Sequence, residues 1–529
     1  MNGNSLVVIG LLIAANLFFS SARQFCLLFM SMKNDFAPYR NLLTRAREIA
    51  LVDAASGLLS WDEETYMPHK ALPFRAEQAA FFSGWSHRMF TAPEVGDWIK
   101  ACEDQGFPPG SDEAINVREW RWSYDRQTKL PSELVEEFNR TTAIARDVWA
   151  EARRRSEFSL FQPHLEKLLG LNCRMADHWG YTESRYDALL ETHERGSRAS
   201  RLRDLFAELR PAMVSILGPA VEKSRAINEN FLEGDYPIAA QQAFNREVAE
   251  AIGFDFDAGR IDTTTHPFCT GVGPGDCRLT TRYNERLFTQ SLYGVLHEAG
   301  HGLYDQGLKA EHYGTPLGTA VSLGIHESQS RLWENHVGRS REFWEHWHPR
   351  ACEHFPALKR FSPDQITRAV NRVAPSFIRV EADQVTYDLH VILRFEIELK
   401  LVEGAVPVPD VPALWNEEFE KMFGLKVPDD ARGCLQDIHW SLGSIGYFPT
   451  YTLGNLNASQ LMRHASQDMP HLQTDLAKGN YRNLLDWLRE RIHEQGQRYL
   501  PQDLMKRATG QPTQSRHHFD YLRKKFAAG

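Results

Sequence analysis

The sequence contains few cysteines, no long basic run and very few segments with the alternating pattern of β-strands. Its seven cysteines are an odd number spread thinly over 529 residues, unlike the dense spacing of a small disulfide-stabilised secreted protein. We therefore interpret them as free thiols. Cys269 and Cys277 lie eight residues apart and could be a metal-binding pair, but no second pair completes four ligands.

An excess of positive charge is also missing. The chain has 60 Lys and Arg against 69 Asp and Glu, which gives a formal net charge of -9. A protein that attracts nucleic acid through its overall field needs the opposite balance. We therefore expect no nucleic-acid partner.

Only one long apolar run is present, at residues 6–19, and it is short for a membrane span, which needs roughly 20 residues. Residues 20–22 resemble a signal-peptide cleavage region, but no Lys or Arg precedes the run. Met30 and Met32 stand just before an ordinary soluble start, so a misassigned start codon is the rival interpretation. We expect a cytoplasmic protein, with export as the alternative, and treat residues 1–31 as an extension.

The rest of the chain, residues 32–529, has the pattern of one helical domain. Apolar residues recur every three or four positions at 39–61, 132–155 and 199–227, which predicts amphipathic helices. Segments rich in Gly and Pro at 107–111, 270–275, 406–412 and 443–450 are too short for linkers between domains and predict loops.

Two further patterns complete the prediction of the fold. Short strand candidates at 259–265 and 276–283 predict a small sheet near the middle of an all-α body. The C-terminal region is polar and helical, with one stripe of apolar residues that we expect to be buried: Leu472, Leu476, Leu484, Leu485, Leu488 and Ile492.

The segment HEAGH at 297–301 carries the strongest chemical signal. Four residues are about one helical turn, so His297 and His301 can direct ring nitrogens to one zinc ion. Glu298 points to a neighbouring sector, from which a carboxylate can act as general base on a water at the metal. The five-letter pattern also occurs by chance, in which case the helix would only carry two surface histidines.

A catalytic zinc needs a third protein ligand and an open position. Glu327 follows 26 residues after His301, which leaves room for a loop and a returning helix. His326 and Glu334 compete for the same role, and Glu327 could instead pair with Arg331, four residues further on.

Six separated blocks in this order make the chain resemble the carboxypeptidase Taq family of zinc carboxypeptidases. The likeness runs from about residue 33 to the end, and six ordered blocks are far more specific than HExxH alone. The blocks are HPF (266–268), DCRLT (276–280), HEAGH (297–301), HESQ (326–329), IRVEAD (378–383) and GCLQDIHW (433–440).

The resemblance implies that His297, His301 and Glu327 hold Zn²⁺, which Co²⁺ could replace, and that Glu298 is the base. It also implies that Arg379 binds the free C-terminal carboxylate of the substrate, as a planar fork of donors can. A salt bridge of Arg379 with Glu381 or Asp383 is the structural alternative.

Four further residues in these blocks are candidates for substrate binding. His439 and Tyr447 could stabilise the oxyanion or contact the peptide, although the apolar segments around them are equally consistent with core packing. Arg278 and His266 are expected to shape the cleft.

The resemblance further implies an all-α body with a long cleft between helical halves, a homodimer, and broad removal of C-terminal residues from peptides. Two features depart from the family: Gln384, where an acidic residue is common, and the apolar N-terminal extension. The alternatives are a helical zinc oligopeptidase that cuts internally and an inactive peptide-binding relative.

Overall fold

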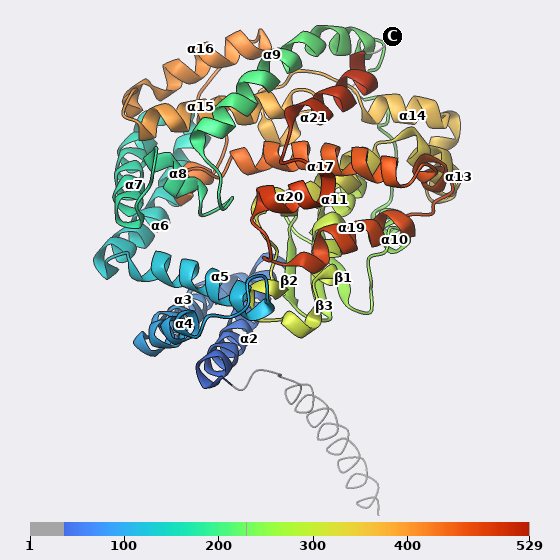
Figure 1. The fold of residues 1–529 in the computed structure, drawn as a ribbon. Coiled ribbons are helices and arrows are strands. Elements are labelled where there is room, and N and C mark those ends of the chain that lie inside the picture. Colours follow the sequence, from blue (N-terminus) through green and yellow to red (C-terminus); the bar gives the residue numbers. More distant parts are fainter. Residues whose placement is uncertain (1–35, 229, 528–529) are drawn as a thin grey trace, which may run out of the picture.

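The computed structural model describes residues 36–228 and 230–527, so the expectations for residues 1–31 lie outside the described part of the chain. Within the described part, the polypeptide forms twenty α-helices, α2 to α21, and one three-stranded sheet (Figure 1). The prediction of an all-α body with a small sheet is confirmed.

The first half of the body is built almost entirely of helices. Those expected at 132–155 and 199–227 are α6 and α9, and the one expected at 39–61 is the longer α2. The helices are α2 (Ala37–Thr65), α3 (Leu72–Thr91), α4 (Pro93–Gln105), α5 (Asp112–Thr128), α6 (Ser132–Arg155), α7 (Phe158–Trp179), α8 (Arg185–Leu190), α9 (Ala199–Ser224) and α10 (Ile238–Ala251).

The second half follows the sheet and ends in a run of helices that includes the predicted C-terminal stripe, all six residues of which are buried. These helices are α11 (Phe288–Gly307), α12 (Leu323–Arg331), α13 (Arg341–His354), α14 (Pro363–Val370), α15 (Tyr387–Val402), α16 (Val411–Phe423), α17 (Pro449–Asp468), α18 (Leu472–Ala477), α19 (Arg482–Arg491), α20 (Pro501–Thr509) and α21 (Ser515–Leu522).

The sheet has the order β1-β3-β2, with β1 (Gly259–Thr263) parallel and β2 (Cys269–Gly273) antiparallel to β3 (Asp276–Thr281). The strands expected at 259–265 and 276–283 are present, but the loop expected at 270–275 is wrong, because β2 occupies most of it. Two glycines in CTGVG obscure the strand pattern, and pairing with β3 supplies the hydrogen bonds instead.

Two large apolar cores meet at one helix, α17. One core gathers α6 to α9, α15 and α16, and the other gathers α10, β3, α11, α12, α13 and the C-terminal helices. Leu453 and Leu456 of α17 belong to the first core, while Ala458 and Leu461 belong to the second. The α17 helix therefore fixes the two halves of the body against each other.

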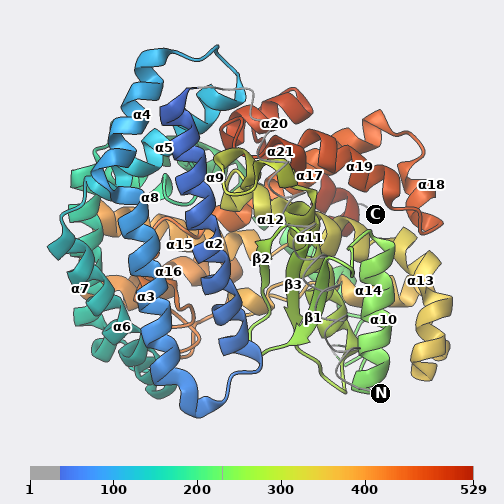
Figure 2. The same cartoon turned by 90° about the horizontal axis from the view of Figure 1, so that it is seen from below.

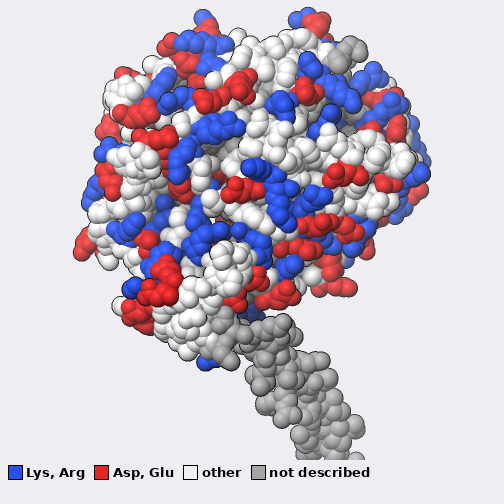
Figure 3. All heavy atoms as spheres, in the orientation of Figure 1, with Lys and Arg blue, Asp and Glu red and all other residues white. Residues whose placement is uncertain are grey.

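The helices α2 to α5 form a smaller unit beside the sheet, with a core of its own around Tyr39, Ile99 and Trp120. Figure 2 shows the sheet between α2 and α10. No helix within the described ranges combines the length and the apolar character that crossing a membrane requires. On the face shown in Figure 3, acidic and basic side chains are interspersed, in keeping with the modest net charge.

Candidate metal centre

His297 and His301 lie one turn apart on α11, and both face Glu327 of α12. The Nε2 atoms of His297 and His301 are 3.6 Å and 3.4 Å from the same carboxylate oxygen, Oε2 of Glu327. Nitrogen and oxygen ligands at about 2.0–2.1 Å from a tetrahedral zinc ion are roughly 3.3 Å apart. The three side chains therefore fit one divalent ion, as their shared cluster also indicates.

Two glycines allow α12 to come close enough for this arrangement. A Cβ atom on Gly300 would lie 2.6 Å from the carbonyl oxygen of Gln329, which belongs to the α12 backbone. A Cβ atom on Gly454 of α17 would lie 2.4 Å from Cγ of Glu327. Any residue larger than glycine at position 300 or 454 would clash with α12, so these two glycines allow Glu327 to lie between α11 and α17.

We expect Gly300→Ala to weaken metal binding by roughly tenfold or more and to destabilise the fold by about 1–3 kcal/mol, because the new methyl group forces α12 away from α11. The measurements are metal affinity in a competition titration and the thermal unfolding temperature. Gly218→Ala in α9 is the matched control, since a Cβ there meets nothing within 4 Å. Equal metal affinity in the two variants would contradict the close-packing argument.

The carboxylate of Glu327 serves two partners through different oxygens. Its Oε1 accepts from Nε of Arg331 at 2.7 Å, and its Oε2 accepts from Ser330 at 2.9 Å on the side of the two histidines. Burial alone would raise the pKa of Glu327, but Arg331 and His297 outweigh it and hold that pKa well below its usual value. The ion pair expected as an alternative to metal binding therefore exists together with the ligand geometry.

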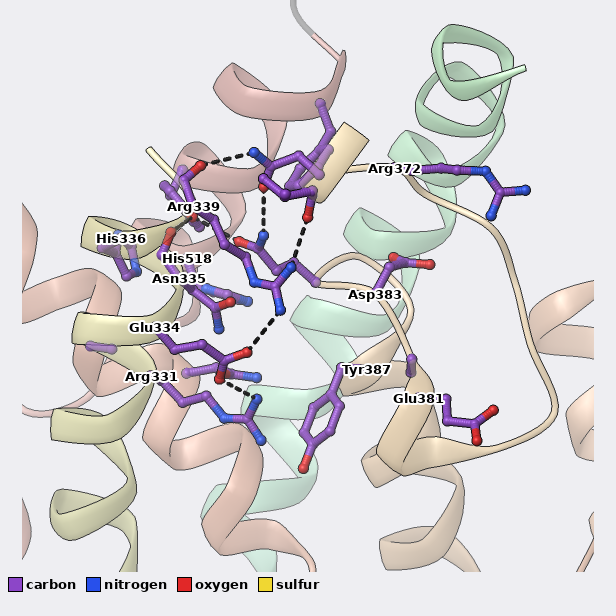
Figure 4. Close-up of a pocket in the computed structure, with 18 residues that line it drawn as sticks. Arg331, Glu334, Asn335, His336, Arg339, Arg372, Glu381, Asp383, Tyr387 and His518 are labelled. Atoms are coloured by element: carbon purple, nitrogen blue, oxygen red, sulfur yellow. Dashed lines mark hydrogen bonds and ion pairs between the residues drawn. The ribbon is translucent and has the colours of Figure 1, made fainter. Parts of the chain in front are cut away.

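His297 is oriented by Glu334, which lies on a π-helical turn over Leu332–Gly338. Nδ1 of His297 is 3.0 Å from Oε2 of Glu334, which leaves Nε2 directed at Glu327. Arg331 and Arg339 both hold Glu334 in place, beside a cavity of about 200 Å³ (Figure 4). Glu334, a competitor for the third ligand position, thus lies on the opposite side of the ring from the cluster.

His301 is oriented in the same way by the other competitor, His326. Their Nδ1 atoms are 2.5 Å apart, and Nε2 of His326 is 3.1 Å from Oδ1 of Asp305. Such partners fix the tautomer and the ring orientation of metal-binding histidines. Sequence reasoning missed Asp305, although its spacing of four residues from His301 on α11 could have indicated it.

Glu298 is buried next to this cluster, with 6% of its surface exposed. No hydrogen bond joins its carboxylate to another residue of the described chain, so both oxygens are available to a substrate or a water. Burial raises the pKa of Glu298 to about 7, and the charges of His297 and Glu327 also act on it. This is the pKa range in which a carboxylate is an effective general base near neutral pH.

Arg379 lies in the other half of the body, at the start of a short helical turn before α15. Its Nε and Nη2 donate to Oδ1 of Asp437 at 3.1 Å and 2.8 Å, and its Nη1 donates to the hydroxyl of Tyr387 at 2.9 Å. The salt bridge of the structural alternative is present, but its acidic partner is Asp437 and neither Glu381 nor Asp383. Two of the five N–H groups of the Arg379 guanidinium have no acceptor among the described residues.

Tyr387 connects Arg379 with the metal ligands. The guanidinium of Arg331, which binds Glu327, stacks 4.4 Å from the ring of Tyr387. Burial alone would lower the pKa of Arg379, but the negative charge of Asp437 outweighs the effect of burial. The pKa of Arg379 is therefore raised well above its usual value. A permanently charged donor thus lies one aromatic ring away from the candidate metal centre.

His439 and Tyr447 belong to an aromatic cluster on the same side as Arg379. Their rings lie 5.1 Å apart, and Nε2 of His439 is 3.0 Å from the hydroxyl of Tyr451. Burial lowers the pKa of His439 to about 3, so this ring is neutral at working pH. Burial raises the pKa of Tyr447, and the charge of Glu327 contributes, which places its hydroxyl in the field of the metal ligands.

The other two candidates lie further away, on and beside the sheet. Arg278 of β3 binds Asp276 through two contacts of 2.8 Å and stacks 4.2 Å from the ring of Trp61 on α2. His266 is exposed in the connection between β1 and β2. The structure does not bring either of them into contact with the described metal ligands, and their role in shaping the cleft stays a prediction.

Comparison with known proteins gives a consistent result. The profile of the family described as carboxypeptidase Taq (M32) metallopeptidase matches residues 41–526. Thermostable carboxypeptidase 1 of Thermus thermophilus is 43% identical over 506 residues, covering 93% of this chain and 99% of its own. Carboxypeptidase 1 of Bacillus subtilis is 36% identical over 482 residues, covering 91% of this chain and 96% of its own.

Solved structures show the same relationship. The crystal structure of the M32 carboxypeptidase from Deinococcus radiodurans R1 superposes with a TM-score of 0.90 at 37% sequence identity, covering 93% of this chain and 99% of that chain. The similarity therefore extends over the whole described body, including both halves that meet at α17.

Proposed function

The chain belongs to the carboxypeptidase Taq family of metallopeptidases and is a metallocarboxypeptidase, and we propose that His297, His301 and Glu327 hold the metal ion of its active site. The observation that carries this proposal is the convergence of three ligand atoms from α11 and α12, each with its own orienting partner. The substrates would be peptides with a free C-terminus, cleaved with broad specificity.

The ion that fits these ligands is zinc, because two neutral imidazoles and one carboxylate with an open position form a typical catalytic zinc site. When bound, it supplies Lewis acidity, which polarises the scissile carbonyl and lowers the pKa of a coordinated water. Co²⁺ accepts the same ligands and would substitute. The Nδ1 contacts of His297 and His301 support this proposal, because they leave both Nε2 atoms available to a metal ion.

Glu298 would take a proton from the attacking water and pass it to the leaving amine. Its carboxylate is adjacent to the ligands without belonging to them, and it has no competing hydrogen bond within the described chain. A single carboxylate can perform both transfers because the proton gained in the first step is the one required in the second. The neutral rings of His439 and Tyr447 would donate hydrogen bonds to the substrate nearby.

Arg379 would select the end of the chain. Its two unused N–H groups match the two oxygens of a terminal carboxylate, and Asp437 and Tyr387 fix the guanidinium plane. A peptide held there with its last residue between Arg379 and the metal presents only its last bond to the water. An enzyme that cuts internally would not need a cation for a terminal carboxylate at this position.

Digestion of one unmodified peptide should therefore yield a ladder of products shortened one residue at a time from the C-terminus. Mass spectrometry of the mixture over time is the measurement. A chelator should stop the reaction and added Zn²⁺ should restore it, while a C-terminal amide on the same peptide should slow it roughly a hundredfold or more, because the amide cannot use the charge of Arg379. Internal fragments, or equal rates on acid and amide, would contradict the proposal.

We also propose that residues 32–529 act as one domain, in a homodimer in the cytoplasm. Within the described chain, α17 contributes to both large cores, which supports a single folding unit. The six cysteines at described positions are all free, in keeping with a reducing compartment. The homodimer is expected from the resemblance to the family. The molar mass of the purified protein, measured by light scattering, tests it.

A further inference from the structure

A second group of metal-ligating side chains lies where the C-terminal part of α11 packs against the sheet. Cys269 of β2, Cys277 of β3 and Asp305 near the end of α11 each direct one ligand atom to a common point, and these atoms lie within 4.8 Å of one another. The two Sγ atoms are 3.7 Å apart, and Sγ of Cys269 is 3.8 Å from Oδ2 of Asp305. Neither cysteine has a part in the proposed hydrolysis, and Asp305 is linked to that centre only through its contact with His326.

These separations match the edges of a coordination tetrahedron. With zinc–sulfur bonds of about 2.3 Å and zinc–oxygen bonds of about 2.0–2.2 Å, tetrahedral geometry places two thiolates roughly 3.8 Å apart and a thiolate and a carboxylate oxygen roughly 3.5 Å apart. A disulfide needs about 2.05 Å between the sulfur atoms. The observed spacing of 3.7 Å is too long for a disulfide, and two thiols that share a hydrogen bond at this distance can both reach one ion.

The surroundings leave room for the ligands. A Cβ atom on Gly271 of β2 would lie 2.9 Å from Oδ2 of Asp305, and a Cβ atom on Gly302 of α11 would lie 3.2 Å from Sγ of Cys277. A side chain at either position would therefore crowd a ligand atom. These two glycines lie on the same two elements as two of the ligands, so the packing of α11 on the sheet forms the pocket.

The cluster can be reached from outside. Cys277 and Asp305 line a cavity of about 640 Å³ between α2, β2 and the segment after α11. This cavity offers an ion a path to two of the three ligands. Buried thiols without such access are inert as ligands.

We propose that Cys269, Cys277 and Asp305 form a second metal site, which binds a thiophilic d¹⁰ ion, with zinc as the physiological ion. The site joins β2, β3 and the C-terminal turn of α11, so its ion stabilises the packing of the sheet on the helix that carries His297 and His301. Sequence spacing could not show this, because the ligand that complements the two cysteines comes from α11, 28 residues after Cys277.

Asp305 places the second site next to the first. Its Oδ2 faces the thiols, and its Oδ1 contacts Nε2 of His326, whose other ring nitrogen contacts His301. The two sites therefore share one connecting carboxylate without sharing a ligand. Only the second site contains sulfur, and this difference allows the two to be measured separately.

Cobalt provides the test, because Co²⁺ bound to thiolate gives a charge-transfer absorption in the near ultraviolet that Co²⁺ on imidazole and carboxylate does not give. The full-length protein, stripped of metal under reducing conditions, is titrated with Co²⁺. We expect the charge-transfer band in the wild type and in His297→Ala, and its loss in Cys277→Ser. Cys102→Ser, which changes an equally buried thiol in α4, is the matched control and should keep the band.

Metal content and stability give independent readouts. The wild type should bind one more equivalent of zinc than Cys277→Ser, and zinc should raise the unfolding temperature of His297→Ala. If Cys277→Ser does not fold, Cys269→Ser tests the same site through the loss of the charge-transfer band, because Cys269 has no hydrogen bond to the described ligands of the first site. Zinc should also protect Cys269 and Cys277 of the wild type from alkylation.

Three results would overturn the proposal. The first is a wild type that binds a single equivalent of cobalt without the charge-transfer band. The second is a band that survives in Cys277→Ser. The third is a disulfide between Cys269 and Cys277 that persists in protein purified under reducing conditions, since it would remove both thiolates.

Discussion

Replacement of Glu298 by Gln should lower kcat by about 10²–10⁴-fold while the metal stays bound, because the substitution removes the proton acceptor and keeps the shape of the side chain. The ligand atoms of His297, His301 and Glu327 are unaffected, since Glu298 makes no hydrogen bond to them. KM should change little, because the peptide is held mainly by other groups.

The same substitution should not weaken the fold. Burial raises the pKa of Glu298 to about 7, above the ordinary value of 4.5, so the folded state favours the protonated form. In the metal-free protein, the stability that this group contributes is therefore present at pH below 4.5 and is lost as the pH rises towards 7. A glutamine side chain does not ionise, so it avoids the cost of burying a charged carboxylate at neutral pH. The metal-free variant should therefore be at least as stable as the wild type at that pH.

Peptide hydrolysis, bound zinc and thermal unfolding measured on the same preparations test both parts of this expectation. Glu490→Gln, an exposed glutamate on α19, is the matched control and should behave as the wild type. Retention of more than about a third of the activity in Glu298→Gln, with metal bound, would show that another group accepts the proton.

Much of this centre was predictable because its parts are local. His297, Glu298 and His301 lie within two turns of one helix, and helical periodicity alone places the histidines together. Glu327 needed the further assumption that a second helix returns to the first. The sequence supported that assumption, but Gly300 and Gly454, which set the distance between the helices, had no detectable signal before the packing was known.

Contacts between distant segments account for what the sequence did not reveal. The partner of Arg379 is Asp437, 58 residues away, whereas sequence reasoning considered only the neighbours Glu381 and Asp383. Strand β2 depends in the same way on its pairing with β3, because CTGVG has little strand propensity by itself. Periodicity reports which face of an element is apolar, and it does not report which element covers that face.

Arg379→Gln should lower kcat/KM on peptides with a free C-terminus by roughly a hundredfold or more, because two hydrogen bonds to a charged group contribute about 1.5–3 kcal/mol each. Cleavage of the matching peptide amide should change little. The ratio of the two rates is the diagnostic quantity, because a general loss of folding lowers both rates equally. A lysine at this position should restore the charge but only part of the preference, since it lacks the planar fork.

A structural role for Arg379 can be separated from substrate binding through Arg394, which shares its partner. Nε of Arg394 donates to Oδ2 of Asp437 at 2.6 Å, and Arg394 is fully buried. Arg394→Lys should therefore lower the unfolding temperature by disturbing the same carboxylate, yet leave the acid-to-amide ratio unchanged. If Arg394→Lys reduced that ratio as much as Arg379→Gln does, the preference would come from the position of Asp437 and not from a direct contact with the peptide.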